Sequence, residues 1–194
     1  MKFAAFMIII FLTATANAEE DNSNRKIHET AVQGTVLDDG PHVYWQNDST
    51  ATVFYYKLGE LLWKSYEVTD TLAFRGFGSH DCEAEYRILP DPPGPSTCGF
   101  DGVSRYMALS DIHGEYDHFI SILRNTGVLD GADSWAWSDG HLVINGDVFD
   151  RGEDVTECLW LIHRLQQEAA RSGGAVHFLL GNHELMILRG DLRY

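Results

Sequence analysis

Hydrophobic positions early in the chain come in short aromatic and β-branched runs, a pattern that predicts β-strands. The runs are 42–45, 52–57 and 61–68, and Gly59 between the last two predicts a hairpin. A proline-rich segment follows at 90–95. Because proline fixes φ and lacks a backbone donor, this segment predicts a linker or a surface loop. We therefore expect a small β-rich extension ahead of the main domain.

From residue 105 onward the pattern alternates between strands and helices. The stretches 105–110, 142–145 and 175–180, which are rich in apolar residues, predict strands, and the stretches 115–126 and 153–172 between them predict helices. Strands and helices that alternate in this way predict an α/β fold with a parallel sheet and right-handed crossovers. In such sheets, ligands bind beyond the carboxyl ends of the strands.

Residues 1–18 have the pattern of a secretory signal peptide. Lys2 precedes the apolar run 3–12, and a small-residue cleavage site follows. A membrane anchor is the alternative, but the run is about half of the roughly 20 residues that a spanning helix needs. We expect a periplasmic or secreted protein with no membrane span after cleavage, divided into an extension (19–104) and a main domain (105–194).

The composition is acidic, with 14 Lys and Arg against 29 Asp and Glu and a net charge of −15. Nucleic-acid backbones and anionic membranes would repel such a chain, so no nucleic-acid polymer is expected as a partner. Export would permit a disulfide between Cys82 and Cys98, although the sequence does not fix their pairing. Cys158 lies among apolar residues of a predicted helix, where we expect a buried free thiol.

A polar motif follows each strand of the α/β part, and the first contains Asp111, His113 and Gly114. Asp111 and His113 can direct an oxygen and a nitrogen at one metal ion, while Gly114 lets the backbone turn into the helix. On its own, such a motif is more often a loop with a capped helix.

The second motif is the segment 146–152. The carboxylate of Asp147 could bridge two cations held roughly 3.5 to 4 Å apart, the separation used in two-metal phosphoryl hydrolysis. Arg151 offers a planar fork of donors that suits phosphate oxygens. The alternative is an acidic loop with an incidental ion pair.

The third motif is the segment 181–184. Asn182 supplies a neutral oxygen to a hard cation, and His183 can donate a proton to a leaving alkoxide. Glu184 is expected to cap or open the next helix rather than to bind metal. Three such strand ends in this order point to metal-dependent hydrolysis of phosphate esters.

The order of these motifs resembles the phosphoprotein phosphatase branch of the calcineurin-like metallophosphoesterase superfamily. The flanking segments 139–143 and 190–194, together with Met186, look most like the Shewanella-like protein phosphatases of bacteria. The resemblance covers residues 105–194 and does not explain the β extension well. It implies the N-terminal half of an α/β/β/α sandwich.

The resemblance also implies four metal ligands and three catalytic residues. The ligands are Asp111 and His113 for the first metal, Asp147 as the bridge and Asn182 for the second metal. The catalytic residues are His183 as general acid, Asp150 to orient it by a hydrogen bond and Arg151 to hold the phosphate. A metal-bound hydroxide would attack phosphorus in line with the leaving oxygen. Oxygen and nitrogen ligands without thiolate favour manganese, iron or zinc.

Two departures from the family pattern stand out. Ser110 occupies a position where many of these phosphatases have glycine. The family completes its second metal site with two histidines on later strands, and no histidine follows His183 in these 194 residues. We therefore expect the N-terminal part of a longer protein, and we expect the isolated chain to lack metal-dependent phosphatase activity.

Other functions fit parts of the sequence. The expected substrate is a phosphorylated protein or a small phosphoester, and related enzymes with these motifs hydrolyse nucleotides or diadenosine polyphosphates. A non-catalytic binding module with a relic site is a further alternative. The aromatic residues of the extension could bind carbohydrate or peptide, but they are expected to pack the hairpin onto the main domain instead. They are Tyr44, Trp45, Tyr55, Tyr56 and Trp63.

Overall fold

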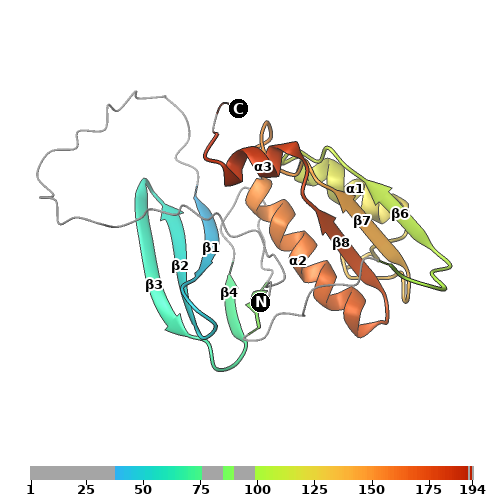
Figure 1. Cartoon of the computed structure of the whole chain (residues 1–194), viewed down its shortest axis with the longest axis horizontal. Helices are drawn as coiled ribbons and strands as arrows, with labels where there is room; N and C mark the ends of the chain where they lie inside the picture. Colours follow the sequence, from blue (N-terminus) through green and yellow to red (C-terminus); the bar gives the residue numbers. More distant parts are fainter. Residues whose placement is uncertain (1–37, 76–84, 90–98, 192, 194) are drawn as a thin grey trace, which may run out of the picture.

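The computed structural model describes residues 38–75, 85–89, 99–191 and 193, which form two small β-sheets beside an α/β unit (Figure 1). The signal-peptide segment, the proline-rich segment and the pair Cys82 and Cys98 lie outside the described residues. In the described part, none of the helices combines the length and the apolar character that crossing a membrane requires.

Three antiparallel strands form the larger sheet of the extension, in the order β1 (Asp39–Trp45), β2 (Thr50–Lys57) and β3 (Glu60–Glu67). The predicted hairpin is confirmed. Its two turn residues, Leu58 and Gly59, have φ of 52° and 82°, the left-handed values that a two-residue type I′ turn requires.

A second sheet pairs β4 (Leu72–Arg75) with β5 (Glu85–Ile88) in antiparallel register. These two strands were not predicted from the sequence. Each has only four residues, which is too short for a pattern of polar and apolar positions to identify a strand.

The aromatic side chains of the extension divide between its two faces. Trp45 and Tyr55 pack against a buried cluster that includes Val43, as expected. Trp63 and Tyr56 do not, since 66% and 45% of their surfaces are exposed. The prediction that all of them pack inward was therefore wrong for these two residues, because successive side chains of a strand point to opposite faces.

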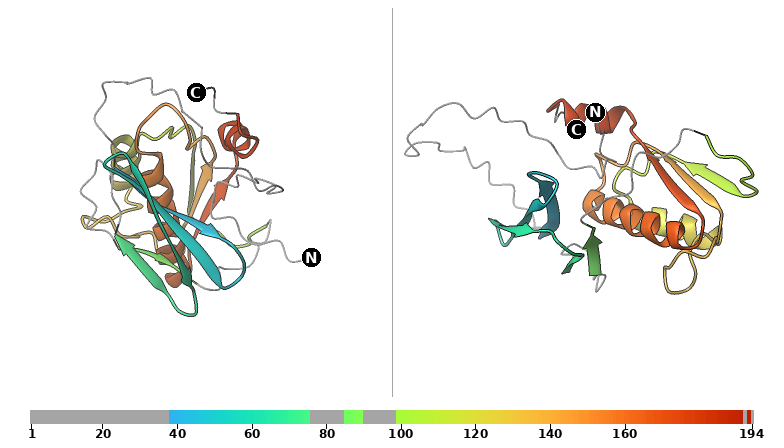
Figure 2. Two further views of the ribbon diagram at one scale, coloured as in Figure 1. Left: turned by 90° about the vertical axis from the view of Figure 1, so that its left-hand side faces the viewer. Right: turned by 60° about the horizontal axis from the view of Figure 1, so that its bottom comes forward.

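The α/β unit contains a parallel sheet in the order β6-β7-β8, which confirms the predicted fold class. Both connecting helices cover one face of this sheet, as the right-hand view of Figure 2 shows, and they bury an apolar core against it. The elements are β6 (Tyr106–Leu109), α1 (Tyr116–Asn125), β7 (His141–Asn145), α2 (Val155–Arg171), β8 (Ala175–Leu179) and α3 (Asn182–Leu188).

Helix α2 joins the extension to the α/β unit because it buries residues on two sides. Leu161 and Leu165 pack in the core under the sheet. Trp160 belongs to the cluster of the extension, and its indole Nε1 donates to the carbonyl of Pro41 at 2.9 Å. Cys158 is a buried free thiol, as predicted, and burial raises its pKa.

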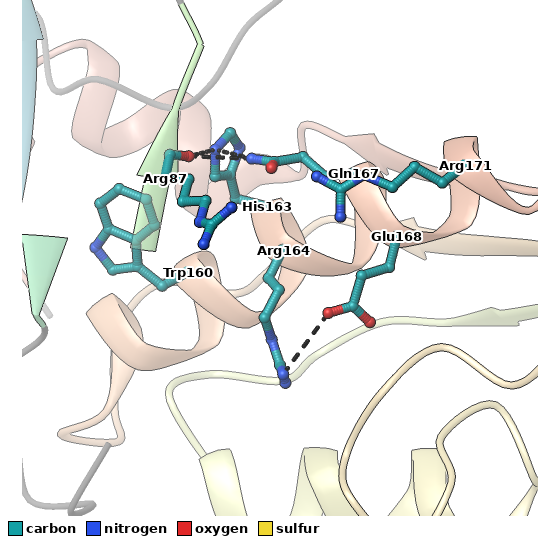
Figure 3. A pocket seen from close by; sticks show the side chains of 7 residues that line it. All are labelled: Arg87, Trp160, His163, Arg164, Gln167, Glu168 and Arg171. Atoms are coloured by element: carbon teal, nitrogen blue, oxygen red, sulfur yellow. Dashed lines mark hydrogen bonds and ion pairs between the residues drawn. The ribbon is translucent and has the colours of Figure 1, made fainter. Parts of the chain in front are cut away.

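A second contact between α2 and the extension lies beside a hollow of about 300 Å³ (Figure 3). His163 and Gln167 of α2 both bond the main-chain carbonyl of Arg87 in β5, at 2.9 and 3.1 Å. Burial lowers the pKa of His163, which favours the neutral ring. Side chains of α2 thus attach both β-sheets to the α/β unit.

The replacement Trp160→Phe tests this attachment. The variant leaves the buried carbonyl of Pro41 without its donor, so we expect the free energy of unfolding to fall by about 1–3 kcal/mol. Urea unfolding followed by circular dichroism measures the change. The control Trp63→Phe alters an exposed tryptophan and should shift stability by less than about 0.5 kcal/mol. Equal losses in the two variants would contradict the proposed role of Trp160.

Candidate functional site

The loops that follow β6 and β7 are bonded to each other at the carboxyl end of the sheet. The backbone N–H of His113 donates to the carbonyl of Asp147 at 3.0 Å, and that of Gly114 donates to Val148 at 2.9 Å. The N–H of Gly152 returns a bond to the carbonyl of His113 at 2.8 Å. These hydrogen bonds hold the loops of the first two sequence motifs side by side, so that they form one continuous surface.

The loop after β8 joins the same surface through close backbone contact. The carboxylate oxygen Oδ1 of Asp147 accepts the backbone N–H of His183 at 3.1 Å. A Cβ atom at Gly146, whose φ is 75°, would collide with the backbone of Gly181. The glycine of the second motif therefore allows the second and third motifs to approach.

Left-handed backbone is concentrated in these loops. Among the described residues, eight non-glycine positions have positive φ, and five of them belong to the motifs. Asp and His tolerate this conformation better than most residues, whereas Arg has no such preference. Strained positions gather where the surrounding structure holds a functional geometry. The five are Asp111 (56°), His113 (49°), Asp147 (55°), Asp150 (70°) and Arg151 (76°).

The ring of His113 is held in one orientation by a main-chain acceptor. Its Nδ1 lies 2.8 Å from the carbonyl oxygen of Phe149, so Nδ1 carries the hydrogen and Nε2 holds a lone pair. Nε2 is buried and has no hydrogen-bond partner among the described residues. Oδ1 of Asp111 lies 3.6 Å from Nε2. Metal-binding histidines are oriented in this way, with the second ring nitrogen bonded to a carbonyl.

The carboxylate of Asp111 lies at the open side of the site, with 65% of its side chain exposed. Its pKa is lowered chiefly by a hydrogen bond from the Ser110 hydroxyl, against a desolvation effect that raises it. The nearby His113 and Arg151 lower it further. The serine at this position therefore favours the charged form of Asp111, a contribution that the sequence pattern did not reveal.

His183 and Asp150 form a shielded pair on the other side of the site. Nδ1 of His183 lies 2.6 Å from Oδ2 of Asp150, and the side chains are only 8% and 9% exposed. The ring of His183 meets that of His113 edge to face, with the centroids 4.7 Å apart. An imidazole held by a carboxylate in this way can deliver a proton to a neighbouring group.

The structure brings all three motifs to one edge of the sheet, but the carboxylates do not close around a single point. Within the described ranges, no three His, Cys, Asp or Glu side chains converge as a ready metal cluster. Asn182 is exposed at the first residue of α3, and Arg151 is exposed at the rim. The donor set nevertheless fits a cation, because the lone pair of His113 is buried, unpartnered and adjacent to a carboxylate.

Residues 104–194 match the sequence profile of the calcineurin-like phosphoesterase family. The chain is 35% identical over 95 residues to Shewanella-like protein phosphatase 2 of Arabidopsis thaliana, covering 49% of this chain and 24% of the relative. It is 36% identical over 90 residues to Shewanella-like protein phosphatase 1 of Plasmodium berghei, covering 46% of this chain and 25% of the relative.

A solved structure of similar fold is the cold-active protein-tyrosine phosphatase of a psychrophilic Shewanella species. The TM-score is 0.64 at 35% identity, and the match covers 81% of this chain and 46% of that one. Because residues 104–194 make up less than half of the chain, this likeness extends into the β extension, which the motif resemblance had left unexplained. The chain spans about a quarter of the length of these curated relatives.

Proposed function

We propose that the protein containing this chain hydrolyses phosphate monoesters and acts as a phosphoprotein phosphatase, because residues 104–194 match the calcineurin-like phosphoesterase family. The observation that carries the proposal is the buried, unpartnered Nε2 of His113 beside the carboxylate of Asp111. Burying a nitrogen lone pair with no hydrogen-bond donor costs free energy unless a ligand binds to it. A cation is such a ligand.

We further propose which residues hold the metal ions. Asp111 and His113 would bind the first ion, Asp147 would contribute to both, and Asn182 would bind the second. When bound, two divalent cations would neutralise phosphate oxygens and increase the acidity of a water molecule. The oxygen and nitrogen donors suit manganese, iron or zinc.

The remaining residues of the site would bind the phosphate and supply the proton. Arg151 lies at the open rim and close enough to Asp111 to lower its pKa, so its guanidinium can bind phosphate oxygens there. His183 would protonate the leaving oxygen through Nε2, since Asp150 holds Nδ1. In this role Asp150 keeps the ring in one orientation and balances the charge of its protonated form.

The proposed substrate is a phosphotyrosine peptide, because the similar solved structures are named protein tyrosine phosphatases. We also propose that the protein is exported, on the basis of the signal-peptide pattern in residues 1–18. The division into an extension (19–104) and a main domain (105–194) belongs to the same proposal.

A substrate panel with metal analysis tests the function. The natural protein that contains this chain is treated with chelator, reloaded with Mn²⁺ and assayed on phosphotyrosine peptide, phosphoserine peptide and diadenosine tetraphosphate. We expect phosphate release that requires metal and is fastest from phosphotyrosine. Cleavage of the dinucleotide alone would replace the proposal with nucleotide hydrolysis. Absence of both bound metal and hydrolysis would indicate a binding module.

A further inference from the structure

The side chain of Glu184 is almost completely buried, with 1% of its surface exposed. Its carboxylate accepts four backbone N–H groups. Oε2 accepts those of Asp147 at 2.8 Å and Gly181 at 2.7 Å, and Oε1 accepts those of Val148 at 2.8 Å and Phe149 at 3.4 Å. Both carboxylate oxygens are therefore fully engaged with the main chain.

Helix capping accounts for only one of these four bonds. The bond to Gly181 closes the first turn of α3, which is the role expected from the sequence. The other three donors belong to a different loop, the one that follows β7. In the described part of the chain, no Lys, Arg or His side chain forms an ion pair with Glu184. Its charge is balanced by the dipoles of these N–H groups.

The turn after β7 has the shape that such a carboxylate would stabilise. Its backbone is left-handed at Gly146, Asp147, Asp150 and Arg151. Successive N–H groups in a turn of this kind converge and form a concave site for an anion. Glu184 occupies that concavity from the neighbouring loop, and a side chain supplied by the protein takes the place that a bound anion has in other turns.

The position of Glu184 in the sequence links both halves of the site. It directly follows His183, whose backbone N–H bonds Oδ1 of Asp147 and whose ring bonds Asp150. A single carboxylate therefore fixes the distance between the loop that carries Asp147 and Asp150 and the loop that carries His183. Displacement of either loop would separate the imidazole from its carboxylate partner.

We propose that Glu184 is a positioning residue for phosphoester hydrolysis. It binds the amides of residues 147–149 and 181 and holds the proposed bridging ligand, the imidazole and its partner in their working arrangement. This inference rests on the proposed function. Glu184 itself touches neither metal nor substrate, since its oxygens are occupied and buried.

Two variants of the 194-residue chain test the structural half of the proposal. In Glu184→Gln, one of the two oxygens becomes an NH₂ group that cannot accept, so only part of the four bonds can form. In Glu184→Ala, all four are lost. We expect the amides of Asp147 and Val148 to exchange hydrogen at least about tenfold faster in the alanine variant, with an intermediate rate in the glutamine variant. Hydrogen exchange by NMR measures each amide.

The matched control is Glu168→Ala on α2. Glu168 is also a partly buried carboxylate that accepts a backbone N–H, that of Trp135 at 2.8 Å, but it lies away from the motif loops. This variant should leave the amides of Asp147 and Val148 at wild-type rates. If Glu184→Ala does not fold, the glutamine variant decides. Wild-type exchange at both amides in a folded Glu184 variant overturns the proposal.

The catalytic part of the proposal is tested by kinetics on the natural protein that contains this chain. We expect Glu184→Gln to lower kcat by about 10–100-fold, the range for partners that orient metal ligands, with KM little changed. The kcat of Glu184→Ala should be lower still, and the kcat of Glu168→Ala should equal that of the wild type. A folded Glu184→Ala protein with wild-type kcat would refute the positioning role. If the wild-type protein hydrolyses no phosphoester, the proposed function fails, whereas the exchange rates still report whether Glu184 holds the turn.

Discussion

The variant His183→Ala is expected to lower kcat on phosphotyrosine peptide by about 10²–10⁴-fold, the usual contribution of a positioned general acid. His183 and Asp150 are bonded at 2.6 Å and shielded from water, so the alanine variant removes the proton donor and leaves a buried carboxylate without its partner. Steady-state kinetics in the natural protein that contains this chain measure the loss.

The identity of the leaving group separates a proton donor from a merely structural residue. p-Nitrophenol leaves readily without protonation, so His183→Ala should be much less damaging on p-nitrophenyl phosphate than on phosphotyrosine. The control His118→Ala removes an exposed histidine of α1 and should leave both substrates unaffected. Equal losses on the two substrates would exclude His183 as the general acid.

The variant Asp147→Asn is expected to weaken Mn²⁺ binding by more than about 100-fold, since residues that only orient metal ligands already cost about 10–100-fold. Asn keeps the size of the side chain and tolerates the left-handed backbone at this position, where φ is 55°, so the main effect is loss of a negative charge. Oδ1 already accepts the N–H of His183, which leaves Oδ2 for a cation.

Calorimetric titration of the metal-free natural protein measures this effect, and phosphate release is expected to fall in parallel. The matched control is Asp139→Asn, which removes an exposed carboxylate just before β7, at the opposite end of the strand from Asp147. Its metal affinity should equal that of the wild type. An unchanged affinity in Asp147→Asn would mean that this carboxylate does not bind the metal.

The α/β unit was predictable from the sequence because its signals are local. The run 142–145 starts with three apolar residues and corresponds to β7, which begins one residue earlier. Glycines after each predicted helix marked the helix ends, and α1 and α2 end within one residue of the predicted positions. The strands β4 and β5 were not predicted because segments of only four residues carry little local pattern.

In the site, the sequence indicated which side chains gather but not what holds them. The motifs placed His113 and His183 at the carboxyl ends of the first and third strands of one sheet, and the structure shows that their rings are in contact. The carbonyl of Phe149, which sets the tautomer of His113, carries no sequence signal because every residue has a carbonyl. The sequence also did not show on which face of the sheet Trp63 lies, since polar and apolar residues do not alternate regularly along the run 61–68.

The left-handed turns also bear on transfer of this site to another scaffold. Grafting usually copies side chains onto regular elements, and idealised backbones avoid positive φ at residues other than glycine. On such a backbone Asp147, Asp150 and Arg151 would point in different directions, even with the correct residues in the correct order. A functional graft must therefore include the entire turn and a buried acceptor for its amides. The smallest transferable unit is a pair of loops rather than a set of ligands.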